Sequence, residues 1–232
     1  MAGPTSLAGR IPVAALDEDA RATFITRTYI HLLFALTGFT LIEIFLFQTG
    51  VAESIARALF GVNWLLVLGA FLVVGWLATH TAHRATSLAA QYAALAGFVV
   101  AEAIIFVPLL YVAQIRAPGT IESAALVTLA GSAGLTIVAF ITRKDFSFLG
   151  GILRFAFVMA LVMIVAAVLF GFELGTFFSV GMIALAGGSI LYDTSKILHH
   201  YPEDRYVAGA LELFASVALL FWYVLRLFMS RR

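Results

Sequence analysis

The stretch VAGALELFASVALLFWYVLRLFM, residues 207–229, is long and apolar enough to cross a membrane as one helix, because about 20 apolar residues span the hydrocarbon core. Its polar residues Glu212, Ser216 and Tyr223 recur with Gly209 at three-, four- and seven-residue spacing, which places them on one stripe of a helix. Polar groups on a membrane helix usually face protein rather than lipid. We therefore expect the other helices of the chain to enclose this segment.

Six further apolar segments precede this one, separated by short connections that hold charges, Gly or Pro. They cover residues 27–48, 61–79, 88–113, 121–141, 152–170 and 175–198. The chain is therefore predicted to be an all-α integral membrane protein with seven transmembrane helices in one domain, residues 26–232. A short polar cytoplasmic tail is expected over residues 1–25, with no cleaved signal peptide and no structure assigned to residues 1–22.

The composition agrees with a membrane protein and disfavours several functional classes. Hydrophobic residues make up 62% of the chain and charged residues 12%, whereas a soluble domain carries about 25% charged residues. The net charge of +1 disfavours a nucleic-acid partner, and the absence of Cys excludes disulfides and thiolate chemistry. No motif of a metalloprotease, serine hydrolase or phosphate-binding loop is present. We expect no enzymatic activity, no metal site and no cofactor.

The distribution of basic residues predicts the orientation in the membrane. With the N-terminus in the cytoplasm, nine Lys and Arg residues lie on the inner side and only Arg57 and Arg116 lie on the outer side. Seven crossings then place the C-terminus outside, although Arg231 and Arg232 lie there. A full crossing by the last segment is favoured over a re-entrant one.

Among the charged residues within the predicted spans, the candidates for a function are Glu43, Glu102, Asp193, Glu212 and Arg226. Each costs several kcal/mol in hydrocarbon, about 2.5 to 3.5 for a central Asp or basic residue, and such residues often mark ion paths. The alternative is that they reach water at span ends or pair to fix helix packing. Asp193 is the strongest candidate, since its helical neighbours are small residues that favour close packing within a bundle.

Three stretches together resemble the transmembrane Bax-inhibitor-motif family, in a bacterial version. They are ITRKDFSFLGG at residues 141–151, ILYDTSKILH at residues 190–199 and ALELFASVALLF at residues 210–221. The resemblance implies a seven-helix fold in which the last helix lies between two layers of three helices. It also implies a location in the bacterial inner membrane and a pH-sensitive leak of cations, notably calcium, controlled by two aspartates.

The family's functional residues match this chain only in part. Asp193 matches the first aspartate, whereas Ser216 stands at the position of the second and Leu219 at the position of a nearby asparagine. Arg226 matches an arginine that latches the last helix to an acidic partner. The resemblance leaves Glu53 or Glu43 as that partner in this chain.

Glu212 lies one turn before Ser216 and at a depth similar to that of Asp193. We therefore expect the carboxyl groups of Asp193 and Glu212 to share a proton, directly or through one water, as two carboxyls at one site do. The competing arrangement is that Asp193 bonds only Ser216 or a basic neighbour such as Lys196, which would weaken the response to pH.

These residues favour a cation or proton pathway gated by Asp193 as the function, with calcium or protons as the transported ions. Two alternatives remain open. Some bacterial members of the family bind membrane-anchored AAA proteases, so the chain can instead be a regulator that transports nothing. The loss of the second aspartate also suits an accessory subunit of a larger membrane complex. In each case the lipid bilayer is a partner.

Overall fold

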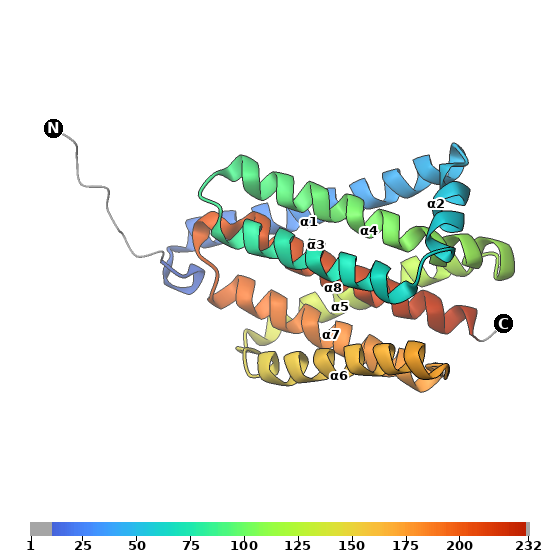
Figure 1. Cartoon of the computed structure of the whole chain (residues 1–232). Coiled ribbons are helices and arrows are strands. Elements are labelled where there is room, and N and C mark those ends of the chain that lie inside the picture. The colour runs from blue at the N-terminus through green and yellow to red at the C-terminus, as the bar shows by residue number, and fades with distance from the viewer. Residues whose placement is uncertain (1–10, 231–232) are drawn as a thin grey trace.

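The computed structural model describes residues 11–230 of the chain and consists of α-helices joined by short connections (Figure 1). The helices are α1 (Glu18–Gln48), α2 (Val51–Phe60), α3 (Trp64–Arg84), α4 (Leu88–Arg116), α5 (Thr120–Thr142), α6 (Leu149–Phe170), α7 (Thr176–His199) and α8 (Tyr206–Met229), with 3₁₀ turns at Val13–Ala15 and Glu203–Arg205. Within the described residues, seven of them, α1 and α3 to α8, are long and apolar enough to cross a membrane. This confirms the all-α membrane fold.

α8 lies at the centre of the bundle. α4 packs against α1 and α3, α7 packs against α5 and α6, and α8 contacts α1, α3, α4, α5 and α7. The last helix therefore lies between two groups of three helices, as its polar stripe and the family resemblance both implied (Figure 1). Ser216 is buried and Glu212 is mostly covered, so the stripe faces protein.

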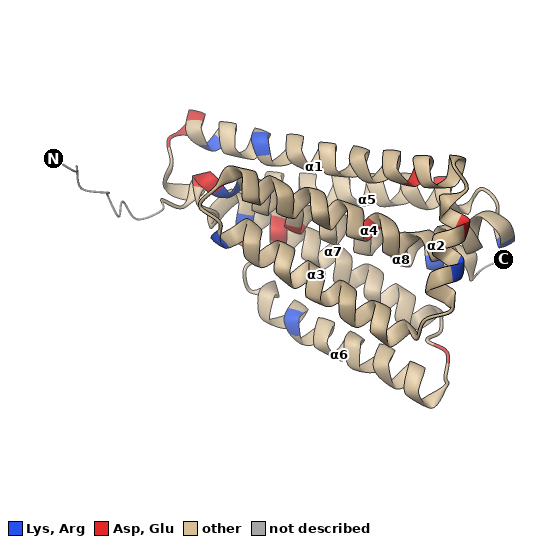
Figure 2. Cartoon of the chain, turned by 45° about the horizontal axis from the view of Figure 1, so that its top comes forward, with Lys and Arg blue, Asp and Glu red and all other residues tan. Residues whose placement is uncertain are grey.

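The outer surface is apolar along the length of the helices. Large side chains such as Leu66, Phe155 and Phe170 are exposed, as expected where lipid rather than water surrounds the protein. Acidic and basic residues lie mostly at the two ends of the bundle, with few between them (Figure 2). The positions of the charges thus mark the two faces that contact water.

The N-terminal region is more ordered than the sequence predicted. Residues 1–10 lie outside the described part, but α1 already begins at Glu18 because Asp17 caps it, accepting a hydrogen bond from Ala20 N at 2.8 Å. Val13 is fully buried and its backbone N–H donates to Tyr201 O at 2.9 Å. The segment before α1 therefore packs on the connection between α7 and α8.

Candidate functional site

A cleft of about 1550 Å³ runs along the bundle between α3 and α6, with α4, α7 and α8 contributing to its walls. Most of its lining is aliphatic or aromatic. Four of the predicted site residues, Asp193, Glu212, Ser216 and Arg226, line it together with Glu102. The structure thus brings most of the candidate residues to one cavity, while Glu43 and Glu53 do not line it.

Asp193 on α7 and Ser216 on α8 form a direct contact. Ser216 Oγ donates to Asp193 Oδ2 at 2.6 Å, and both residues are buried. The two helices approach closely because small residues line their interface. At Gly209 of α8, an added Cβ would lie 3.2 Å from side-chain atoms of both Ile197 and Thr28, so a larger residue would push α8 away from α7 and α1.

Glu212 joins three helices. Its Oε2 accepts a hydrogen bond from Lys196 Nζ on α7 at 2.7 Å, and His83 Nε2 on α3 lies 2.7 Å from its Oε1. Lys196 also lies over the rings of Tyr192 and Tyr201, at 5.3 and 5.2 Å from their centroids. Both carboxylate oxygens of Glu212 therefore have basic partners, which offset the cost of holding the charge in the bundle.

Asp193 and Glu212 thus each have partners of their own. The hydrogen bond to Asp193 comes from Ser216, which is the alternative that the sequence offered to a proton shared between Asp193 and Glu212. The physical reason is the position of Lys196, three residues after Asp193 on α7. The face of α7 that carries Asp193 also carries Lys196, and the Lys196 ammonium binds the Glu212 carboxylate.

The predicted latch of Arg226 is wrong. Within the described residues no carboxylate lies within 4.0 Å of Arg226; instead its Nη2 donates to the carbonyl oxygen of Leu174, between α6 and α7, at 2.8 Å. Glu53 pairs instead with Arg57, one turn further along α2. Glu43 is buried, and neither of its carboxylate oxygens has a hydrogen-bond partner. A backbone carbonyl thus replaces the acidic partner expected for Arg226.

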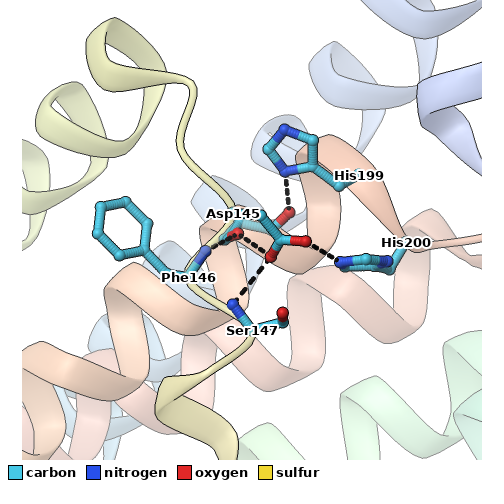
Figure 3. A network of polar contacts seen from close by, with 6 residues as sticks. Asp145, Phe146, Ser147, His199 and His200 are labelled. Carbon is cyan, nitrogen blue, oxygen red and sulfur yellow. Dashed lines mark hydrogen bonds and ion pairs between the residues drawn. The ribbon is translucent and has the colours of Figure 1, made fainter.

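A second polar network, which sequence reasoning missed, holds the connection between α5 and α6 against the end of α7 (Figure 3). Asp145 Oδ1 accepts from the backbone N–H of Ser147 at 2.8 Å, and Asp145 Oδ2 lies 2.8 Å from His200 Nε2. Ser195 Oγ lies 3.3 Å from Asp145 Oδ1 and accepts from Phe146 N at 2.8 Å. The bonds from Ser147, and those from His200, lower the pKa of Asp145 from 3.8 to about 2.

The signal for this network was present in the sequence, because Asp145 and His200 lie in two of the stretches that resemble the family. What the sequence does not show is that two connections so far apart in the chain meet. His199 lies apart from this network, with its Nδ1 2.9 Å from the Ser195 carbonyl oxygen on its own helix. The described residues hold no group of three or more side chains able to bind a metal.

A buried arginine completes the same end of the bundle. Arg205 is 1% exposed, donates from Nη1 to the Ala85 carbonyl between α3 and α4, and lies 3.4 Å from Asp204 Oδ2. Neighbouring Tyr201 is also buried; burial and the negative charge of Glu212 raise its pKa well above the ordinary value, so its hydroxyl stays neutral. The connections α3–α4 and α7–α8 are therefore joined to each other.

Comparison with known proteins identifies the family. The family model described as "Inhibitor of apoptosis-promoting Bax1" matches residues 21–232. The chain is 33% identical over 98 residues to an uncharacterized protein of Pseudomonas aeruginosa, covering 41% of this chain and 43% of that protein. It is 36% identical over 81 residues to the modulator of FtsH protease YccA of Escherichia coli, covering 34% of this chain and 36% of YccA.

The chain thus spans less than half of the length of these two curated relatives. The family match, by contrast, covers all seven predicted membrane helices apart from the first turn of α1. On that match, and on the bundle in which α8 is central, the chain belongs to the Bax-inhibitor family of membrane proteins.

Proposed function

We propose that this chain is a regulator of a membrane-anchored AAA protease and that it transports nothing itself. In this proposal it crosses the bacterial inner membrane seven times, with its N-terminus in the cytoplasm, and catalyses no reaction. The similarity to YccA, named as a modulator of the FtsH protease, supports the partner. The observation that carries the proposal is the pairing of Glu212 with Lys196 and His83, which leaves neither of its carboxylate oxygens free beside Asp193.

An ion path needs polar groups that an ion can exchange with along its length. In the cleft, Asp193 accepts a hydrogen bond from Ser216 and Glu212 is paired with Lys196, so both carboxylates already have partners that a passing cation would have to displace. The rest of the lining is mostly apolar. These contacts suit a bundle held in one arrangement better than one that opens with pH.

The end of the bundle that carries the N-terminus offers the surface that a protease would contact. Arg143 and Lys144 are exposed there, and Phe148, four residues after Lys144, is 65% exposed. The network around Asp145 holds this connection in place, so the surface is preformed. A preformed surface loses less conformational entropy on binding than a disordered one.

The test is reconstitution of the full chain with a purified FtsH protease and a membrane substrate in proteoliposomes. We expect the chain to change the rate of substrate degradation by several fold, and the double variant Lys144→Glu with Phe148→Ser to lose this effect. Arg116→Glu, at the opposite end of the bundle, is the matched control. A degradation rate that the chain leaves unchanged would contradict the proposal.

A second function, a pH-sensitive leak of calcium or protons, is favoured by the position of Asp193 on the wall of the cleft. Liposomes that contain the purified chain would then release calcium at a rate that depends on pH and that Asp193→Asn abolishes. The variant Ser216→Asp, which supplies the family's second aspartate, should increase that dependence. Efflux by the unaltered chain that requires Asp193 would replace the regulator proposal.

A further inference from the structure

We propose that the cleft between α3 and α6 binds an acyl chain of an anionic phospholipid, with the lipid phosphate at Arg154. The two helices face each other across the cleft with apolar stripes. On α3 the stripe includes Leu68, Leu72 and Gly75, and on α6 it includes Phe157, Leu161 and Ile164. Both sets recur at three- or four-residue spacing, so each lies on one face of its helix.

The cleft opens towards the lipid. Trp76 on α3 and Val158 on α6 both line it, yet they are 65% and 57% exposed. α3 and α6 also make only sparse contact with each other. The opening therefore lies along the membrane-crossing part of both helices, at the depth of the hydrocarbon.

An apolar space of about 1550 Å³ needs an occupant. Water is a poor one, because a buried water needs two to four polar partners and most of this lining offers none. An unfilled space forfeits the dispersion contacts of its lining. The surrounding bilayer supplies flexible apolar chains in excess, and one of them can enter through the opening between α3 and α6.

Arg154 selects the head group. It lines the cleft near the start of α6, its Nε donates to the Gly150 carbonyl of its own helix, and no acidic residue among those described pairs with it. Its long apolar stem allows the guanidinium to reach the head-group region. A phosphate is the partner that this group binds best, through two parallel hydrogen bonds.

An arginine lines each end of the cleft, and the partners of the neighbouring acidic residues orient the lipid. At the end opposite Arg154, Arg226 donates to the Leu174 carbonyl and the adjacent Glu173 lines the cleft. On the wall nearer to Arg154, Glu212 is paired with Lys196 and His83, and Asp193 accepts a hydrogen bond from Ser216. We therefore place the anionic head group at Arg154. An acyl chain extending from there would cover the Asp193–Ser216 contact, which lies on the same cleft wall. This inference is independent of any protease partner.

The experiment uses the full chain in nanodiscs with phosphatidylglycerol or phosphatidylethanolamine that carries a photoreactive group in the acyl chain, with the crosslinked residues mapped by mass spectrometry. We expect crosslinks on the facing stripes of α3 and α6 and a preference for phosphatidylglycerol. Arg154→Gln should reduce that preference about fivefold, since a basic residue near an anionic membrane surface contributes about 1 kcal/mol. Arg143→Gln, exposed at the same end but outside the cleft, should leave it unchanged.

Filling the cleft provides a second measurement. Leu161→Trp should reduce crosslinking to the stripes, whereas Leu126→Trp, on the exposed face of α5, should not. Gly75→Leu serves if the Trp variant does not fold, because an added Cβ there meets only the Phe98 ring at 3.4 Å. Equal crosslinking of α5 and the cleft, or equal effects of the two Arg variants, would overturn the proposal.

Discussion

Ser216 Oγ on α8 donates a hydrogen bond of 2.6 Å to Asp193 Oδ2 on α7, in the buried centre of the bundle. Ser216→Ala leaves a buried carboxylate without this donor, so we expect the free energy of unfolding to fall by about 1–3 kcal/mol. Denaturant unfolding in detergent micelles measures the change. Ser123→Ala is the control, because this exposed hydroxyl bonds only the Gly119 carbonyl on its own helix. Equal effects of the two changes would contradict the assigned role of the contact.

Glu212 holds Lys196 and His83 at once, so its removal leaves a cation unpaired inside the bundle. We expect Glu212→Gln to destabilise the protein by about 3 kcal/mol or more, as breaking one side of a buried ion pair does. Adding Lys196→Gln to this variant should recover part of the loss. A double-mutant cycle measures the coupling, and strictly additive effects would show that the ion pair does not contribute.

The contacts of Asp145 predict that the stability of the connection between α5 and α6 depends on pH. Its folded pKa, about 2, lies below the ordinary value of 3.8, so its contribution to stability is present above about pH 4. That contribution is lost as the pH falls from about 4 to about 2. Hydrogen exchange at Phe146 and Ser147, corrected for the intrinsic rate, should therefore accelerate over this range. Asp145→Asn should remove this acceleration. If hydrogen exchange in the variant still accelerates over the same pH range, other groups cause the effect.

Arg226 has a backbone carbonyl rather than a carboxylate as its partner. Arg226→Gln should therefore cost about 1.5–3 kcal/mol, the range of one hydrogen bond made by a charged group. Double variants with Glu53→Gln or Glu43→Gln should show effects that add to within about 0.5 kcal/mol. A larger coupling energy, measured by thermal unfolding, would show that Arg226 does pair with one of these two glutamates.

Gly150 and Gly151 form a matched pair at the start of α6. An added Cβ at Gly150 would lie 2.9 Å from Tyr192, whereas one at Gly151 meets nothing within 4 Å. We expect Gly150→Ala to destabilise the packing of α6 on α7 by about 1–3 kcal/mol, the usual cost of overpacking. Gly151→Ala should be neutral or stabilising, because Ala favours helix. Equal unfolding midpoints would mean that Tyr192 moves aside freely.

The spans could be predicted because their signal is local: each helix is apolar over the length that a bilayer requires. The polar stripe of Glu212 and Ser216 likewise indicated that α8 is enclosed. The first turns of α1 were missed because hydropathy marks only the apolar part of a helix. The acidic residues from Asp17 to Asp19, typical of a helix N-terminus, were the overlooked signal.

The partners of the site residues could not be read from the sequence. They depend on the rotation of each helix about its axis and on which connections meet. Similar depth placed Glu212 near Asp193, but only the packing of α3 and α7 shows that His83 and Lys196 reach it. Arg226 was assigned a carboxylate because the family has one, whereas a backbone carbonyl near the end of α6, which no side-chain pattern marks, takes its place.

The central position of α8 has a consequence for biosynthesis. This helix follows the other six spans in the chain, so the ribosome makes it after them. Until it enters the membrane, the faces of α1, α4, α5 and α7 that it covers have no permanent neighbour. Its insertion then completes the bundle. A nascent chain stalled before residue 206 would therefore display interhelical surfaces to quality-control machinery in the membrane.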